Sequence, residues 1–181
     1  QRVVPGTRIL NGKYPIATGL EHDEMGHPTG SPKLHLQMTA KRRKKFQTLA
    51  ATLPTPKIYG PSEGNVLLVG WGSTEGPIRE AVDRARAAGD SISSIHIRSI
   101  SPLPPGLENI FSGFNHVFVV EINDEGIYSQ GGQLAALLRS RYCNPAIRGI
   151  NKTDGLTWKV KEILAAVKTK IEAIKNESVN A

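Results

Sequence analysis

Residues 64–78 read GNVLLVGWGSTEGPI, a pattern typical of a buried strand that passes through a glycine-rich turn into a helix. The residues 66–69 are all apolar, as expected for a strand covered on both faces of a parallel sheet. In the next segment, 75–88, Ile78, Ala81, Val82 and Ala85 recur at the spacing of one buried helix face. The sequence therefore predicts a strand–turn–helix unit of an α/β domain.

The alternation of strand and helix continues toward residue 175. Further strands are predicted at residues 92–97, 117–120 and, more weakly, 146–150. Further helices are predicted at residues 107–111, at 132–142 and from 157 onward. Such alternation is typical of a largely parallel sheet with helices on both sides.

The part before Gly64 has a different composition. Residues 1–32 are rich in glycine and proline, which predicts an irregular arm. A helix is predicted at residues 33–51, and the prolines at 54, 56 and 61 indicate a stiff linker. We therefore divide the chain into an irregular arm (1–32), a basic helix with a proline-rich linker (33–63) and an α/β domain (64–181).

The net charge of +7 is concentrated in the arm, where ten Lys and Arg stand against four Asp and Glu before Gly64. The basic run of the predicted helix consists of Lys41, Arg42, Arg43, Lys44 and Lys45. Five consecutive residues sweep the whole circumference of a helix, so no apolar face can cross this turn. We expect a solvated face, an acidic protein partner or a coenzyme phosphate. Nucleic acid is disfavoured because only Phe46 is near for stacking.

Several classes of protein are excluded or disfavoured by what the chain contains. Cys143 is the single cysteine, which excludes an internal disulfide and a four-thiolate cluster, and we expect it to be buried as a small apolar group. No apolar run approaches the ~20 residues of a membrane span, and there is no signal-peptide pattern. We expect a cytoplasmic protein and, since the first residue is Gln1, a piece of a longer one.

The glycine-rich turn is a candidate anion site, because it lies between a buried strand and a helix N-terminus. Its candidate residues are Gly70, Gly72, Ser73 and Thr74. The glycine spacing misses the dinucleotide fingerprint, and no Lys-Ser/Thr pair completes a P-loop. The next predicted strand ends His96-Ile97-Arg98, without the acidic residue that binds a ribose. We favour a tight turn, with phosphate or coenzyme A binding as the alternative.

Two other clusters of polar residues could carry chemistry. Glu121, Asn123 and Asp124 follow the third strand, at the edge where open α/β sheets bind ligands. Glu121 is a candidate general acid or base, but we favour a structural or interface role because no histidine or lysine partner is close in sequence. The second cluster is metal-like in composition and consists of Glu21, His22, Asp23, Glu24 and His27. Its spacing does not match a helical zinc motif, so we expect a hydrogen-bonded loop that packs on a partner, without a metal.

Several segments together resemble the α subunit of 2-oxoacid:ferredoxin oxidoreductases. These segments are TGLEHDEMGHPT (18–29), KRRK (41–44), LVGWGSTEGPI (68–78), PLPP (102–105) and VEINDEG (120–126). The likeness ends with RYC (141–143) and GINKTDGL (149–156), the latter containing Asn151, Lys152 and Asp154, and it is greatest to the 2-oxoglutarate branch. It runs over nearly the whole chain in the right order.

The resemblance implies a transketolase C-terminal-like domain, a three-layer α/β/α fold. It implies a mostly parallel five-stranded sheet with one antiparallel edge strand, for which Lys57-Ile58-Tyr59 is our candidate. The arm would end a preceding pyrimidine-binding domain. Enzymes of this family decarboxylate a 2-oxoacid on thiamine diphosphate and Mg²⁺, pass electrons through iron–sulfur clusters to ferredoxin and release acyl-coenzyme A.

The resemblance assigns no catalytic residue to this chain. The family's diphosphate–magnesium motif, Gly-Asp-Gly followed by an Asn pair, is absent, because Asp154-Gly155 lacks the leading glycine. That motif belongs to the partner β subunit, so we expect the fragment to bind no cofactor and to be inactive alone. Its expected role is assembly with the β subunit and the other α-subunit domains, with coenzyme A docking as a further expectation. The alternatives are a stand-alone phosphate- or nucleotide-binding module and a nucleic-acid contact through the basic helix.

Overall fold

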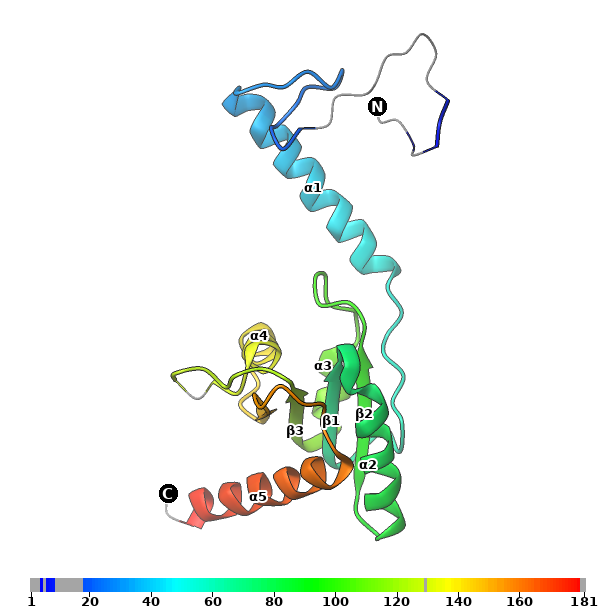
Figure 1. The fold of residues 1–181 in the computed structure, drawn as a ribbon, viewed down its shortest axis with the longest axis vertical. Helices are drawn as coiled ribbons and strands as arrows, with labels where there is room; N and C mark the ends of the chain where they lie inside the picture. Colours follow the sequence, from blue (N-terminus) through cyan, green and yellow to red (C-terminus); the bar gives the residue numbers. More distant parts are fainter. Residues whose placement is uncertain (1–3, 5, 9–17, 129, 180–181) are drawn as a thin grey trace. The chain divides into compact units, whose positions relative to one another are not determined.

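The computed structural model describes residues 4, 6–8, 18–128 and 130–179 (Figure 1). Much of the arm, at 1–3, 5 and 9–17, therefore lies outside the described residues, as do the predictions made for it. By its contacts the chain divides into two units, Gln1–Thr52 and Leu53–Ala181. The proline-rich segment after Thr52 thus belongs to the same unit as the α/β domain.

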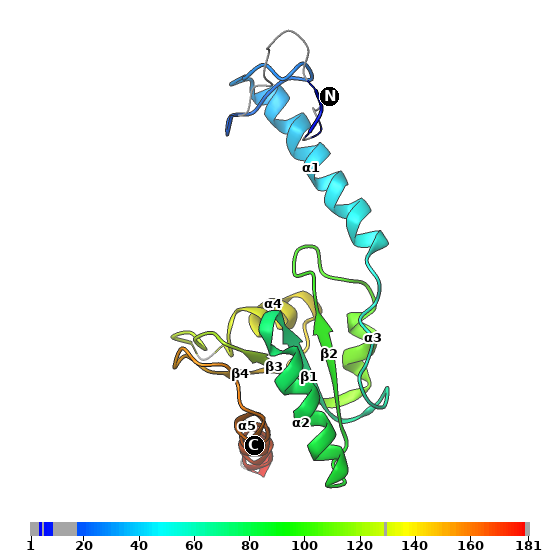
Figure 2. The same cartoon turned by 45° about the vertical axis from the view of Figure 1, so that its right-hand side comes forward.

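The larger unit is built on a parallel sheet with the strand order β2-β1-β3-β4 (Figure 2). The strands are β1 (Gly64–Trp71), β2 (Ile92–Ile97), β3 (Phe114–Glu121) and β4 (Ile147–Asn151). The helices are the short 3-10 helix η2 (Gly72–Thr74), α2 (Glu75–Ala87), α3 (Leu107–Ser112), α4 (Gln133–Tyr142) and α5 (Val160–Val179). Strand and helix alternate along the chain as predicted.

Helices cover both faces of this sheet, because alternate strand residues point to opposite sides. Leu67 and Val69 of β1 pack with α3 and α4 in one apolar cluster. Val66 and Leu68 pack with α2 and α5 in the other. All of these side chains are buried, which explains why residues 66–69 are continuously apolar. The predicted three-layer α/β/α class is confirmed.

The expected fifth strand was wrong as a strand, since Lys57-Ile58-Tyr59 contributes only one antiparallel bridge to β2. Tyr59 and Ser94 exchange both backbone hydrogen bonds, at 2.8 and 3.0 Å. The ladder does not extend because prolines at 56 and 61 lack an N–H group, and Gly60, with φ +116°, breaks the extended path. Among the described residues the sheet has four strands.

The smaller unit consists of a short hairpin and the helix α1 (Pro32–Thr52). His22 pairs antiparallel with Pro28, and Thr29 N–H donates to the carbonyl oxygen of Glu21 at 2.8 Å. None of the residues of α1 is buried. The helix therefore has no fully buried apolar face.

Candidate functional site

The buried carboxylate of Glu121 is fully engaged at the carboxyl end of β3. The residue is 0% exposed. Its Oε1 accepts the backbone N–H of Ala135 at 2.9 Å, and its Oε2 accepts the N–H of Leu134 at 3.1 Å and the side-chain amide of Asn123 at 2.9 Å. The positive end of the α4 dipole adds to these bonds. Glu121 is therefore a helix cap inside the domain, and its bonding leaves it unsuited to general acid–base work.

The neighbouring residues join β3, β4 and the loop between β4 and α5 around this cap. The side-chain amide of Asn151 donates to the carbonyl oxygen of Asn123 at 3.2 Å. The carbonyl oxygen of Glu121 accepts the indole N–H of Trp158 and the backbone N–H of Lys152, both at 3.2 Å. The structure thus brings the end of β3 together with the end of β4 and the loop that follows it. They hold the carboxyl edge of the sheet in place.

The loop after β4 is fixed by ion pairs of its own. Lys152 Nζ contacts Glu162 Oε2 at 2.7 Å and Asp154 Oδ2 at 3.4 Å, and it lies 5.6 Å from the centre of the Trp158 ring. The hydrogen bond with Glu162 raises the pKa of Lys152 and lowers that of Glu162. Asp124, in the preceding loop, accepts the N–H of Gly126 at 2.8 Å, which closes a turn.

The glycine-rich turn is closed by its own residues. The hydroxyl of Thr74 donates to the carbonyl oxygen of Trp71 at 2.9 Å and accepts the Trp71 N–H at 3.0 Å. A Cβ atom at Gly70 would lie 2.6 Å from Ile78 Cδ1 and 2.9 Å from Thr74 Oγ1, so a larger residue there would displace the side chains that pack the turn and α2 against β1. Gly72, with φ +59°, and Ser73 remain exposed. This geometry favours the tight-turn interpretation over a phosphate cradle.

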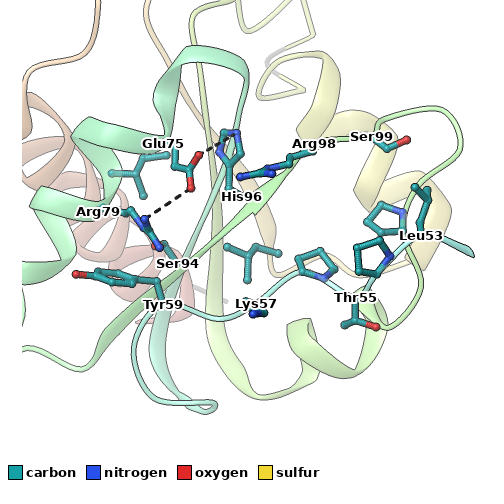
Figure 3. Close-up of a pocket in the computed structure, with 15 residues that line it drawn as sticks. Leu53, Thr55, Lys57, Tyr59, Glu75, Arg79, Ser94, His96, Arg98 and Ser99 are labelled. Carbon is teal, nitrogen blue, oxygen red and sulfur yellow. Dashed lines mark ion pairs between the residues drawn. The ribbon is translucent and has the colours of Figure 1, made fainter.

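A pocket of about 390 Å³ opens next to this turn, at the carboxyl end of β2 (Figure 3). Its lining comes from the linker, from the start of α2, from the end of β2 and from the loop that follows β2. The residues are 53–57, Tyr59, Glu75, Ile78, Arg79, 94–96, 98, 99 and Pro104. In Figure 3 the carboxylate of Glu75 lies between Arg79 and His96, at 3.9 Å from Arg79 Nη1 and from His96 Nε2. Burial lowers the pKa of His96 below its usual value. Sequence reasoning missed this pocket.

Tyr59 organises one wall of the pocket. Its hydroxyl donates to Asp83 Oδ1 at 2.9 Å, and this bond raises the pKa of Tyr59. The guanidinium of Arg79 lies over its ring, 4.6 Å from the centroid. The antiparallel bridge to Ser94 fixes the backbone at the same place. The linker thus ties α2 to the edge strand of the sheet.

The metal-like cluster of the smaller unit is a hydrogen-bonded hairpin. Glu21 accepts a bidentate pair of hydrogen bonds from Arg42, at 2.8 and 3.1 Å, and this contact lowers the pKa of Glu21. Asp23 Oδ1 accepts the backbone N–H groups of Met25 and His27, both at 2.9 Å. His22 Nδ1 lies 2.7 Å from the Asp23 carbonyl oxygen. No group of three metal-ligating side chains occurs among the described residues.

The basic run of α1 is exposed, but one of its members is already used. Arg42 is held by Glu21, whereas Lys41, Arg43, Lys44 and Lys45 make no ion pair with an acidic side chain of the described chain. The exposed apolar side chains of this helix are Leu36, Phe46 and Leu49. The exposed surface of this helix therefore carries both positive charge and apolar groups.

Two further predictions are tested by the structure. Cys143 was expected to be buried, which was wrong: it is exposed and takes the left-handed position after α4, with φ +49°. In the part of the chain that the structure describes, no helix combines the length and apolarity that crossing a membrane requires.

Known proteins resemble this chain over most of its length. The sequence model of the family described as pyruvate:ferredoxin oxidoreductase core domain II matches residues 64–163. The α subunit of 2-oxoacid:ferredoxin oxidoreductase 2 from Aeropyrum pernix is 35% identical over 161 residues, which are 87% of this chain and 24% of that subunit. The 2-oxoglutarate oxidoreductase subunit KorA from Mycobacterium tuberculosis is 30% identical over 165 residues, 90% of this chain and 23% of that subunit.

A solved structure agrees with these relatives. The 2-oxoglutarate:ferredoxin oxidoreductase from Magnetococcus marinus, with 2-oxoglutarate, coenzyme A and succinyl-CoA bound, is 30% identical and has a TM-score of 0.73. The alignment covers 93% of this chain and 28% of that one. This chain thus spans about a quarter of the length of its relatives. Because the family model covers more than half of its residues, the chain belongs to the pyruvate:ferredoxin oxidoreductase core domain II family, and its relatives are subunits of 2-oxoacid:ferredoxin oxidoreductases.

Proposed function

We propose that the chain is a C-terminal portion of the α subunit of a thiamine-diphosphate-dependent 2-oxoglutarate (2-oxoacid):ferredoxin oxidoreductase. The whole enzyme would convert a 2-oxoacid and coenzyme A to acyl-coenzyme A and CO₂ while it reduces ferredoxin. The part described here would serve subunit assembly. The observation that supports a non-catalytic role is the hydrogen bonding of Glu121. This carboxylate lies at the carboxyl edge of the sheet, but both of its oxygens accept backbone N–H groups at the start of α4.

The described residues do not fit the cofactors of such an enzyme. A diphosphate-bound Mg²⁺ needs free oxygen ligands, whereas Glu121 and Asp154 are each bonded within the domain. An iron–sulfur cluster needs several thiolates, and Cys143 is the single cysteine of the chain. We therefore assign thiamine diphosphate, Mg²⁺ and the clusters to the β subunit or to other domains.

Two surfaces support a role in assembly. The first is α1, with its exposed basic run and apolar side chains. The second lies on the loops that follow β3 and β4, which run side by side in Figures 1 and 2 and are joined by the bond from Asn151 to Asn123. Ile127 and Tyr128 on these loops are 89% and 85% exposed, and Leu156 is exposed as well. Large apolar side chains with this exposure are typical of contact surfaces.

Turnover is the first test of this proposal. The purified chain is mixed with thiamine diphosphate, Mg²⁺, 2-oxoglutarate, coenzyme A and oxidised ferredoxin, and ferredoxin reduction is followed. We expect no reduction by the chain alone. Measurable turnover would overturn the proposed division of labour, because the catalytic groups would then have to lie in this chain.

Association is the second test. In the full-length α subunit, Arg43→Glu combined with Lys44→Glu should weaken co-purification with the β subunit, because it reverses two exposed charges of α1. The matched control is Lys161→Glu combined with Lys168→Glu, which reverses two exposed charges of α5. If both pairs leave association unchanged in low salt, the assembly role of the basic run is wrong.

A further inference from the structure

The pocket beside α2 carries more positive than negative charge. Its lining includes the cations of Lys57, Arg79 and Arg98 and the single carboxylate of Glu75. The contacts of Glu75 to Arg79 and His96 are 3.9 Å long, which is beyond hydrogen-bond distance. Lys57 and Arg98 make no ion pair with any acidic side chain of the described residues. With three cations and one carboxylate, the lining carries a net charge of +2.

The guanidinium of Arg79 is held in place before any ligand arrives. It lies over the ring of Tyr59, whose hydroxyl is bonded to Asp83 and whose backbone is paired with Ser94. An arginine fork that is already oriented loses little side-chain entropy when it binds an anion. Its planar geometry matches two oxygens of a phosphate or carboxylate.

His96 adds a neutral hydrogen-bond donor. Its Nδ1 atom is buried and has no hydrogen-bond partner. A proton on Nδ1 would be a buried donor without an acceptor, which costs about 1–3 kcal/mol. The neutral ring is therefore expected to carry its proton on Nε2, the atom that faces Glu75. Burial also lowers the pKa of His96, so the ring is neutral near pH 7.

The remaining lining is apolar and gives the pocket room for more than an ion. Ile78, Ile95, Pro54 and Pro56 line it, and its volume of about 390 Å³ lies in the range of small-molecule sites. A phosphate monoester carries roughly −1.5 to −2 charges at pH 7, which matches the net charge of +2 of the lining. A monocarboxylate would leave one positive charge of the lining unmatched.

We propose that this pocket binds a small organic phosphate, with Arg79 and Arg98 on the phosphate and the body of the molecule against Ile78 and the prolines. The site lies where β2 ends, and there Arg98 stands at the position where a ribose-binding fold has an acidic residue. Phosphate recognition therefore replaces hydroxyl recognition at this place in the fold. The inference goes beyond the assembly role and does not depend on it.

Calorimetry and NMR on the full chain test the proposal with three probes: phenyl phosphate, inorganic phosphate and benzoate. We expect phenyl phosphate to bind most tightly, by about tenfold over each of the others, because it alone supplies both the dianion and an apolar body. Amide shifts should be confined to the pocket lining, that is to residues 53–59, to the start of α2 and to residues 94–99. Shifts at the basic run 41–45 instead, or no binding of phenyl phosphate, would overturn the proposal.

Two variants distinguish binding of phenyl phosphate in this pocket from nonspecific attraction of an anion to a basic protein. Arg98→Gln should weaken phenyl phosphate binding by about tenfold, because it removes one charge-assisted contact. Arg86→Gln makes the same charge change at an exposed position of α2 outside the pocket, and it should leave affinity unchanged. Equal weakening by both variants would show a diffuse charge effect and refute the site. Arg98 is exposed, so the variant should fold, which the thermal midpoint checks.

Discussion

The carboxylate of Glu121 lies 2.9 Å from the backbone nitrogen of Ala135, so the last residue of β3 caps the first turn of α4. No cationic side chain forms an ion pair with this buried carboxylate among the described residues. Its charge is instead stabilised by backbone N–H groups, by Asn123 and by the helix dipole. The cap also fixes where α4 begins relative to the sheet, because both ends of the contact belong to regular elements.

Replacing Glu121 by glutamine should destabilise the domain by about 2–4 kcal/mol. One carboxylate oxygen becomes an NH₂ group, which then faces a backbone N–H with no acceptor between them. Urea unfolding followed by circular dichroism measures the change. Glu125→Gln, four residues further at an exposed position, is the matched control and should stay within about 0.5 kcal/mol of the unmodified chain. Similar midpoints for both variants would contradict the capping role.

The role of Glu121 shows how far the sequence could lead. The position of Glu121 at the carboxyl edge of the sheet was predictable, since it directly follows an apolar strand. The hydrogen bonds of its carboxylate were not predictable. Its partners are backbone N–H groups 13 and 14 residues further along, and every residue other than proline has such a group whatever its side chain. Because these hydrogen bonds were not visible in the sequence, Glu121 was considered as a general acid or base.

Replacing Gly149 by alanine should prevent stable folding. A Cβ atom at this position would lie 1.7 Å from the carbonyl oxygen of Gly131, and a backbone atom cannot rotate away. We expect a loss of more than about 3 kcal/mol, seen as a collapse of the urea midpoint or as insoluble protein. Gly76→Ala is the control, because a Cβ atom there would have no neighbour within 4 Å and the position is helical. It should stabilise by up to about 1 kcal/mol; equal losses would contradict the close contact.

The pKa of Glu21 should depend on one particular arginine of the basic run. The Arg42 hydrogen bonds hold the pKa of Glu21 below its usual value. The contact is therefore fully formed at a pH above the usual pKa of a glutamate, and it is lost as the pH falls through the lowered pKa. Arg42→Gln should move the Glu21 pKa back up, as followed by NMR titration of its carboxyl carbon. Arg43→Gln removes the same charge from the next residue and should move it much less. If the two variants act alike, the bidentate contact is not the cause.

Sequence patterns did not predict the pocket, and they wrongly predicted a strand at Lys57-Ile58-Tyr59. Histidine at 96 and arginine at 98 were visible at the end of the second strand, but neither Glu75 nor Tyr59 is near them in sequence, so only the folded chain makes a pocket of them. The predicted fifth strand does not form for a local reason, because prolines on both sides of Lys57-Ile58-Tyr59 interrupt the hydrogen-bond ladder. Cys143 was misplaced because its left-handed backbone position depends on how α4 ends.

His96 should make the stability of the domain depend on pH. Burial, Arg98 and Arg79 lower the pKa of His96 below 6.5, while Glu75 raises it. The folded state therefore binds fewer protons at this ring than the unfolded state does. The resulting contribution to stability is present above pH 6.5 and is lost as pH falls from there toward the lowered pKa. His96→Gln should consequently lose less stability than the unmodified chain between pH 7.5 and about pH 5.5, which urea unfolding at several pH values measures.

Two further variants test the direction in which neighbouring charges shift the pKa of His96. Arg98→Gln removes a repelling cation, so the pKa of His96 should rise, whereas Glu75→Gln removes an attracting carboxylate, so it should fall. NMR titration of the His96 ring carbons reads both shifts directly. Shifts in the same direction, or a His96 pKa at or above 6.5 in the unmodified chain, would contradict the arrangement of charges around the ring, because desolvation and the two arginines would then not outweigh Glu75.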